Sequence, residues 1–205
     1  YGIREGLLYS AMDKKLREQD PLVEACRHME STSARMPGFG LILFNFIMPL
    51  FETSEKNFVS LIKAACFLHD VSWRAHPDYR AEVCFDNATR ANLGGIDHQG
   101  RAFLATALLY RYKSPKKSDT FSKVFSILDK EDKRRAEILG TAMRFGAMLS
   151  GSTAASMGKL ELDNSKKLLK LKISEKNKDL FGEVVQQRFE SVALRMSYKP
   201  IIMWT

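Results

Sequence analysis

The feature that most constrains the fold of this 205-residue chain is a change in the spacing of its apolar residues after Gly151. Before that point, apolar residues recur at the spacing that is typical of amphipathic helices. After it, residues 159–162 and 169–173 alternate between apolar and charged side chains on either side of the turn residues Asp163-Asn164-Ser165. Alternation with a period of two predicts a β-hairpin with one apolar face and one lysine-rich face. The chain is therefore predicted to be mainly α, with a small C-terminal α+β unit.

Helices are predicted over most of the chain before the hairpin. An apolar stripe from Leu7 to Leu16 predicts the first. Asp20-Pro21 supplies an N-cap followed by proline at the first helical position, which starts a second helix that ends near residues 36–38. Further helices are expected near residues 39–51, 54–70, 78–91, 98–113, 131–149 and 179–196, and a last strand near 201–204 could join the hairpin. These patterns divide the chain into residues 1–19, a helical domain over 20–150 and an α+β unit over 151–205.

Positive charge is concentrated in the second half of the chain. The formal net charge is +8, but residues 1–100 contain 11 basic and 13 acidic side chains, whereas residues 101–205 contain 21 and 11. A near-neutral half joined to a basic half suggests a polyanionic partner, such as nucleic acid, polyphosphate, a nucleotide or an anionic membrane surface. A solvated basic surface is the alternative, and charge alone does not separate the two.

Cysteine usage and hydropathy favour a cytoplasmic protein. The three cysteines, Cys26, Cys66 and Cys84, are odd in number and far apart, and each has apolar neighbours, so buried free thiols in a reducing compartment are expected. The most apolar stretch, residues 39–51, is interrupted by Asn45 and Pro49 and is short for a membrane span. No targeting segment is recognisable in the first dozen residues. No membrane contact is therefore expected.

One dipeptide, His69-Asp70 at the end of a predicted helix, has catalytic character. An imidazole nitrogen and a carboxylate oxygen can together bind a divalent metal, and this pair gives the HD phosphohydrolases their name. Such a site also needs an upstream histidine and a downstream aspartate. The available partners fit poorly: His28 lies upstream, Asp129 and Asp132 lie where acidic residues cap a helix, and His76 and His98 could add loop ligands. A working metal site, a metal-free HD-like helical domain and coincidence all remain open.

Three groups of basic residues are candidates for binding an anion. The segment 73–80 combines Arg74, His76 and Arg80 with aromatic residues, and arginine can hold phosphate oxygens bidentately. The competing interpretation is that Arg74 and Arg80 pair with Asp78 and Glu82. The second group surrounds Pro115 and the third lies on the predicted hairpin; their members are Lys113, Lys116 and Lys117, and Lys166, Lys167, Lys170 and Lys172.

Four segments resemble the C-terminal part of the exopolyphosphatase and guanosine pentaphosphate phosphohydrolase family. Residues 3–9 (IREGLLY) look like the stretch that leads out of that family's actin-like domains. Residues 63–77 (KAACFLHDVSWRAHP) and 95–105 (GIDHQGRAFLA) resemble its degenerate HD segment and the helix that follows. The tail from residues 143–146 (MRFG) to Trp204 is similar to its terminal α+β unit.

The resemblance implies that this chain lacks the catalytic centre. In that family, two actin-like domains hold the Mg²⁺, the phosphate-binding loops and the catalytic carboxylate, so residues 1–19 would be a linker helix from a missing actin-like domain. Residues 20–150 would be a degenerate HD-like domain, with no cofactor expected in this chain. The chain would bind polyphosphate or guanosine pentaphosphate and form a homodimer; the residues expected to bind substrate are Arg74, His76, Arg80, Lys113, Lys116 and Lys117.

Two other functions stay open at this stage. The chain could be a self-sufficient HD-type nucleotide phosphohydrolase with His69 and Asp70 as metal ligands, in which case tightly bound metal is expected. It could also be a helical module that binds nucleic acid, although nucleic acid is not the expected partner. That module would prefer nucleic acid to polyphosphate at equal charge.

Overall fold

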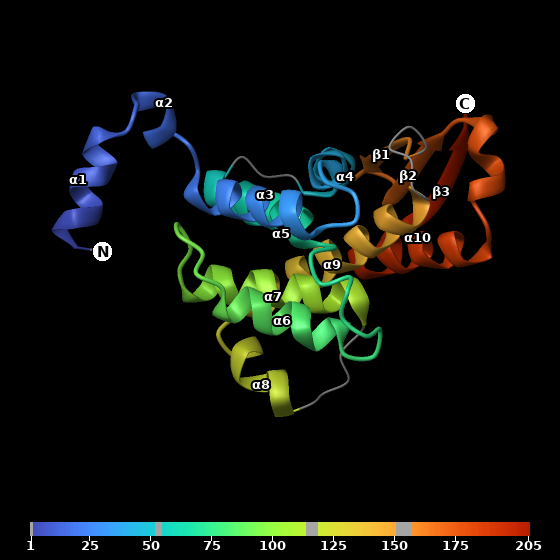
Figure 1. Cartoon of the computed structure of the whole chain (residues 1–205). Helices are drawn as coiled ribbons and strands as arrows, with labels where there is room; N and C mark the ends of the chain where they lie inside the picture. Colours follow the sequence, from blue (N-terminus) through green and yellow to red (C-terminus); the bar gives the residue numbers. More distant parts are fainter. Residues whose placement is uncertain (1, 52–54, 114–118, 151–156) are drawn as a thin grey trace.

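The computed structural model describes residues 2–51, 55–113, 119–150 and 157–205, and the statements below concern these ranges (Figure 1). Helices dominate, and three strands lie near the C-terminus, so the predicted mainly α fold with a small α+β unit is confirmed. In chain order the elements are α1 (Ile3–Ala11), α2 (Lys14–Arg17), α3 (Pro21–Ser33), α4 (Phe39–Ile47), the 3-10 helix η1 (Met48–Leu50), α5 (Lys56–Leu68), α6 (Arg80–Arg90), α7 (His98–Tyr112), α8 (Asp119–Phe125), α9 (Lys130–Leu149), β1 (Lys159–Asp163), β2 (Leu168–Ile173), the 3-10 helix η3 (Glu175–Leu180), α10 (Glu183–Met196) and β3 (Lys199–Trp204).

Aspartate caps set the starts of α3, α7 and α9. The Asp20 carboxylate accepts hydrogen bonds from the amides of Leu22 and Val23, at 2.9 and 3.1 Å, and Pro21 occupies the first position of α3. Asp97 and Asp129 cap α7 and α9 in the same way. Each carboxylate satisfies amide groups that the first turn leaves without partners, so the helix starts follow directly from the sequence.

The helical body is built around α7. Both α6 and α9 pack along it, and α5 contacts it as well. Its buried side chains include Leu104, Leu108 and Leu109, and no solvent-exposed apolar residue interrupts them. At Gly140 of α9 an added Cβ would overlap the carbonyl oxygen of Ala107, which shows how closely α9 approaches α7. Because α7 is covered on several sides, apolar residues are buried around most of its circumference.

The three strands form one sheet in the order β1-β2-β3. β1 and β2 make the predicted antiparallel hairpin, in which Leu160 faces Leu171. α10 then carries the chain across, and β3 pairs with β2 in parallel, so the last segment joins the hairpin. Leu160, Leu169, Leu171 and Ile173 are buried in the same hydrophobic core as the helices. The α+β unit therefore folds directly onto the helical body, with α10 lying along α9 (Figure 1).

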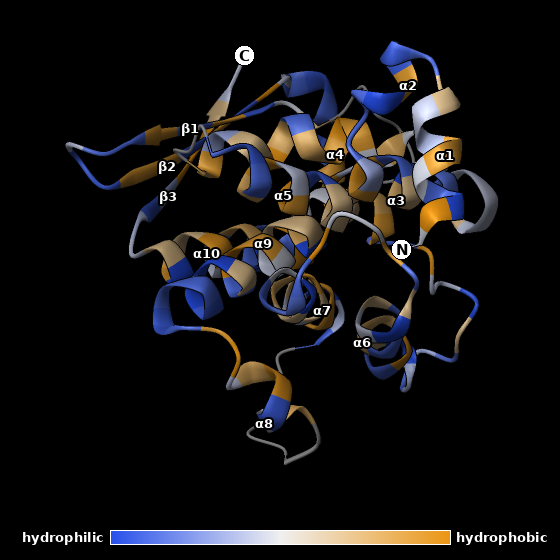
Figure 2. Ribbon diagram, turned by 90° about the vertical axis from the view of Figure 1, so that its left-hand side faces the viewer, coloured by the Kyte–Doolittle hydropathy of each residue, from blue (hydrophilic) through white to orange (hydrophobic). Residues whose placement is uncertain are grey.

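The N-terminal segment stands apart from this core. The expected single helix over residues 7–16 is two short helices, because the backbone of Met12 is extended and Asp13 starts α2. Neither helix has a buried residue, and Ile3 and Leu7 are 86% and 65% exposed. Figure 1 shows α1 projecting from the body, and Figure 2 shows hydrophobic segments on it.

The structure confirms the prediction for the cysteines and adds the helix α8, which was not predicted. Cys26, Cys66 and Cys84 are free and buried, as expected, and burial raises the pKa of the Cys26 thiol to about 12. α8 was not predicted, because its seven residues are too few for a helical period to be recognised. In the ranges that the structure describes, every helix is too short or too polar to cross a membrane.

Candidate functional site

The His69-Asp70 pair lies at the end of α5 and is buried, with exposed fractions of 4% and 5%. His69 Nδ1 is 2.7 Å from the carbonyl oxygen of Cys66, and its ring lies against that of Phe39. Since a carbonyl can only accept, Nδ1 carries the proton in this contact. Asp70 accepts two hydrogen bonds from one guanidinium, from Arg35 Nε at 2.7 Å and Arg35 Nη2 at 2.6 Å. Both side chains of the motif are therefore held by protein groups.

The surroundings fix the charge of each member of this pair. Burial and the nearby Arg111 guanidinium lower the pKa of His69 to about 4, so its imidazole is neutral at neutral pH. For Asp70, burial favours the protonated form, but the hydrogen bonds from Arg35 and the other nearby positive groups outweigh it and lower the pKa. A neutral imidazole beside an aspartate that is already ion-paired is a stable structural arrangement.

The other histidines and carboxylates considered for a metal site do not gather around this pair. Among the described residues, no three His, Cys, Asp or Glu side chains are grouped so that they could hold a metal ion. His28 is exposed on α3, Asp129 caps α9, and Asp132 accepts a hydrogen bond from Gln99. Metal binding by His69 and Asp70 stays a prediction, and a metal there would have to compete with Arg35 for both carboxylate oxygens.

The loop after the pair uses its cations largely for its own structure. Arg80 donates to the carbonyl oxygens of Trp73, at 2.7 Å, and Ala75, at 3.1 Å, and so closes the loop. The Arg74 guanidinium lies 4.8 Å from the centre of the Trp73 ring, and Arg74 and His76 are exposed. The alternative pairing of Arg74 and Arg80 with Asp78 and Glu82 is not what the structure contains.

Several lysines of the two predicted clusters likewise pair with groups of the protein itself. Lys113 forms an ion pair with Glu82, while Lys116 and Lys117 lie outside the described residues. On the hairpin, Lys170 pairs with Asp163 at 2.9 Å and Lys172 pairs with Glu161 at 2.7 Å. Lys167 differs from these two, because its ammonium lies 5.0 Å from the centre of the Tyr198 ring.

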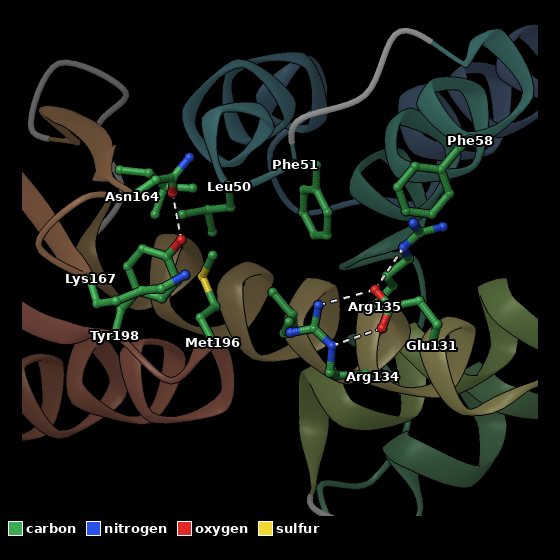
Figure 3. A pocket seen from close by; sticks show the side chains of 12 residues that line it. Leu50, Phe51, Phe58, Glu131, Arg134, Arg135, Asn164, Lys167, Met196 and Tyr198 are labelled. Atoms are coloured by element: carbon green, nitrogen blue, oxygen red, sulfur yellow. Dashed lines mark hydrogen bonds and ion pairs between the residues drawn. The ribbon is translucent and has the colours of Figure 1, made fainter.

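Lys167 lines a pocket of about 520 Å³ between the hairpin and the start of α9 (Figure 3). Arg134 and Arg135 lie on the opposite wall, and both donate hydrogen bonds to the Glu131 carboxylate, Arg134 at 3.1 Å and Arg135 at 3.2 Å. The Arg135 guanidinium also lies 5.0 Å from the centre of the Phe58 ring. The pocket is lined by Leu50, Phe51, Phe58, Glu131, Arg134, Arg135, Ile138, Leu162, Asn164, Lys167, Met196 and Tyr198. Three cations and one carboxylate face a cavity with aromatic walls, which suits an anionic ligand.

A second pocket, of about 660 Å³, adjoins this one and has the opposite character. It shares Phe58 and Arg135 with the first, but its lining also includes Asp20, Asp97 and Asp132. Asp20 and Asp97 already cap helices. An extended polyanion would be repelled by these carboxylates, so Arg135 marks the boundary of the surface on which such a ligand is favoured.

Sequence reasoning missed two of the three cations in the first pocket. Arg134 and Arg135 lie in the charged helix start in which Asp129 and Asp132 were interpreted as helix caps. Their role depends on Phe58 and on the hairpin turn with Lys167, which are distant in the sequence. The hairpin cluster was correctly singled out as basic, although its lysines could not be separated into paired and available ones without the strand register.

The comparisons with known proteins bear on which family this fold represents. Residues 42–202 match the family model described as the C-terminal part of exopolyphosphatase. The search of curated proteins found no match. The matched range extends from α4 to β3 and covers more than half of the chain. It includes α5 and α9, which contribute residues to both pockets. The chain therefore belongs to the exopolyphosphatase C-terminal family, as its sequence motifs indicated.

Proposed function

We propose that this chain is the substrate-binding part of an exopolyphosphatase-type phosphoanhydride hydrolase. The observation that carries the proposal is the pocket in which Arg134, Arg135 and Lys167 line opposite walls. A polyphosphate or guanosine pentaphosphate chain has a negative charge on each phosphate, and spaced cations hold such a backbone as they hold nucleic acid. Membership of the exopolyphosphatase C-terminal family supports the same function.

In this proposal the hydrolytic chemistry belongs to residues outside the chain. Mg²⁺ would be bound by the actin-like domains of the parent enzyme, and a carboxylate there would orient the attacking water. The chain's own part is to hold the polyanion, with homodimerisation in the cytoplasm as a further expectation. Arg134 and Arg135 both pair with the Glu131 carboxylate. A phosphate that enters the pocket would therefore replace Glu131 as the anionic partner of Arg134. Arg74 and His76, which are exposed, could extend the basic surface.

The proposal is tested by polyphosphate binding at a series of salt concentrations. We expect Arg134→Gln and Lys167→Gln each to weaken binding and to reduce the slope of log K against log salt by about one, as the loss of one phosphate contact predicts. Lys166→Gln is the matched control, because Lys166 is the exposed neighbour of Lys167 and does not line the pocket. Equal loss in Lys166→Gln and Lys167→Gln would show that only diffuse charge attracts polyphosphate.

The other two candidate functions predict different results. A self-sufficient HD phosphohydrolase would release phosphate from polyphosphate with Mg²⁺ or Mn²⁺ and would lose that activity in His69→Ala. A nucleic-acid-binding module would retain duplex or single-stranded DNA in competition with polyphosphate of equal charge. We expect no sustained phosphate release from this chain, and displacement of DNA by polyphosphate.

A further inference from the structure

Three charged side chains of the first pocket form one network near the start of α9. Arg134 Nε and Nη2 donate to the two carboxylate oxygens of Glu131, each at 3.1 Å, and Arg135 Nε donates to the same carboxylate at 3.2 Å. Spacings of three and four residues bring all three side chains to one face of the helix. Figure 3 shows Glu131 between the two guanidinium groups, with Arg134 toward the hairpin and Arg135 toward Phe58.

Arg135 has partners besides Glu131. Its Nη1 lies 3.8 Å from Asp132 Oδ1, and its guanidinium lies 5.0 Å from the centre of the Phe58 ring. These contacts place Arg135 beside the second pocket, whose lining contains carboxylates. The protein therefore fixes Arg135 on the side of the first pocket where a polyanion is least favoured.

Arg134 differs from Arg135 in having a single counter-ion. Within the described ranges, Glu131 is the one carboxylate that pairs with Arg134, whose side chain is 53% exposed. Lys167 lines the same cavity from the opposite wall. A phosphate chain held between Arg134 and Lys167 would take Arg134 from Glu131 and leave that carboxylate paired with Arg135. Without Arg135, the carboxylate would lie beside the bound anion and repel it.

We propose that Glu131 is an internal competitor for Arg134, and that Arg135 is a positioning residue that retains Glu131 when polyphosphate displaces it. The inference rests on the proposed function, because it concerns how that pocket releases a cation to its ligand. The hydrogen bonds from Arg134 lower the pKa of Glu131, and the positive charges of both arginines lower it further, so the competing carboxylate is ionised at neutral pH.

The experiment measures the Kd of polyphosphate for the full chain at one salt concentration, in the wild type and in variants of these residues. Glu131→Gln keeps the shape of the side chain but removes its charge, so it should tighten binding by about fivefold, the upper range for an exposed ion pair. Glu190→Gln is the matched control, because Glu190 is exposed on α10 and does not line the pocket. It should change the Kd by less than about twofold, because salt screens distant charges.

A double-mutant cycle tests the role of Arg135. Arg135→Gln should weaken binding by about threefold when Glu131 is present, and by less when it is combined with Glu131→Gln, because the carboxylate that Arg135 retains is then neutral. An arginine that contacts the ligand itself gives the opposite order, because the loss of Glu131 would free it for phosphate. A smaller loss in the double variant also separates this role from a general loss of folding.

The failure of this inference differs from the failure of the proposed function. A wild type that does not bind polyphosphate overturns the proposed function and this inference with it. A wild type that binds, with Glu131→Gln no tighter than Glu190→Gln, overturns the inference alone. An Arg135→Gln loss that is equal or larger in combination with Glu131→Gln does the same, and would make Arg135 a direct ligand contact.

Discussion

At the scale of single residues, His69 couples folding to pH. Its pKa in the folded chain is about 4, below its ordinary value of 6.5, because the imidazole is buried and lies near Arg111. The unfolded chain therefore binds more protons between these two values. The stability that neutral His69 contributes is fully present above pH 6.5 and is lost as the pH falls towards 4. We expect a loss on the order of 2–3 kcal/mol over this interval from His69 alone.

Urea unfolding at pH 7 and pH 4.5 measures this effect in the wild type and in His69→Asn. The asparagine amide can still donate to the Cys66 carbonyl but does not titrate, so the variant should lose less stability on acidification than the wild type. His28→Asn is the control, because His28 is exposed and its change should leave the pH dependence as it is. Equal acid sensitivity in all three proteins would show that carboxylates alone set it.

The same residues show how far sequence reasoning reaches at this scale. The His69-Asp70 motif was recognisable because its two members are adjacent. Its partner Arg35 was not, because 35 positions separate it from Asp70 and only the packing of α3 against α5 unites them. Arg80 shows the opposite limit: an arginine beside aromatic residues suggested phosphate binding, which stays a prediction, and its hydrogen bonds to backbone carbonyls leave no sequence signal.

At the scale of the elements, the approach of α9 to α7 depends on Gly140. A Cβ at this position would lie 2.5 Å from Cβ of Tyr110 and would overlap the carbonyl of Ala107. Backbone atoms of a packed helix cannot move aside cheaply, so Gly140→Ala forces the two helices apart. We expect a loss of about 1–3 kcal/mol in the free energy of unfolding, which urea denaturation measures.

The control for this prediction is Gly6→Ala in α1. Nothing lies within 4 Å of a Cβ added there, so the substitution only improves the local helix propensity. Its free energy of unfolding should stay within about 0.5 kcal/mol of the wild type. A Gly140→Ala protein as stable as Gly6→Ala would mean that α7 and α9 can separate without cost.

Secondary structure was more predictable than its assembly. The caps at Asp20, Asp97 and Asp129 and the period-two hairpin act over a few residues, so local sequence determines them. That the last segment joins the sheet was anticipated from its apolar run, but its parallel pairing with β2 follows from the α10 crossover. The pocket also depends on this crossover, because it places Tyr198 beside Lys167.

At the scale of the whole molecule, charge and packing divide the chain differently. The basic second half includes α9, the hairpin and α10, and the structure gathers Arg134, Arg135 and Lys167 around one pocket. Packing links this half to the first, because the strand residues share the core of the helices. A polyanion bound in the pocket would contact both the helical body and the hairpin, and would stabilise their association.

The N-terminal segment has no part in this common core, which leads to a prediction about the whole chain. α1 and α2 bury no residue, and Asp20, which caps α3, marks the start of the packed body. A chain that begins at Gln19 should therefore have a free energy of unfolding within about 0.5 kcal/mol of that of the full chain. The slope of this free energy against urea concentration should also be equal, because unfolding exposes the same core. Amide chemical shifts of the core should also superimpose. Because the apolar side chains of Ile3 and Leu7 are exposed, their removal should reduce any self-association of the full chain. A loss of more than about 1 kcal/mol would instead mean that α1 packs against the body in solution.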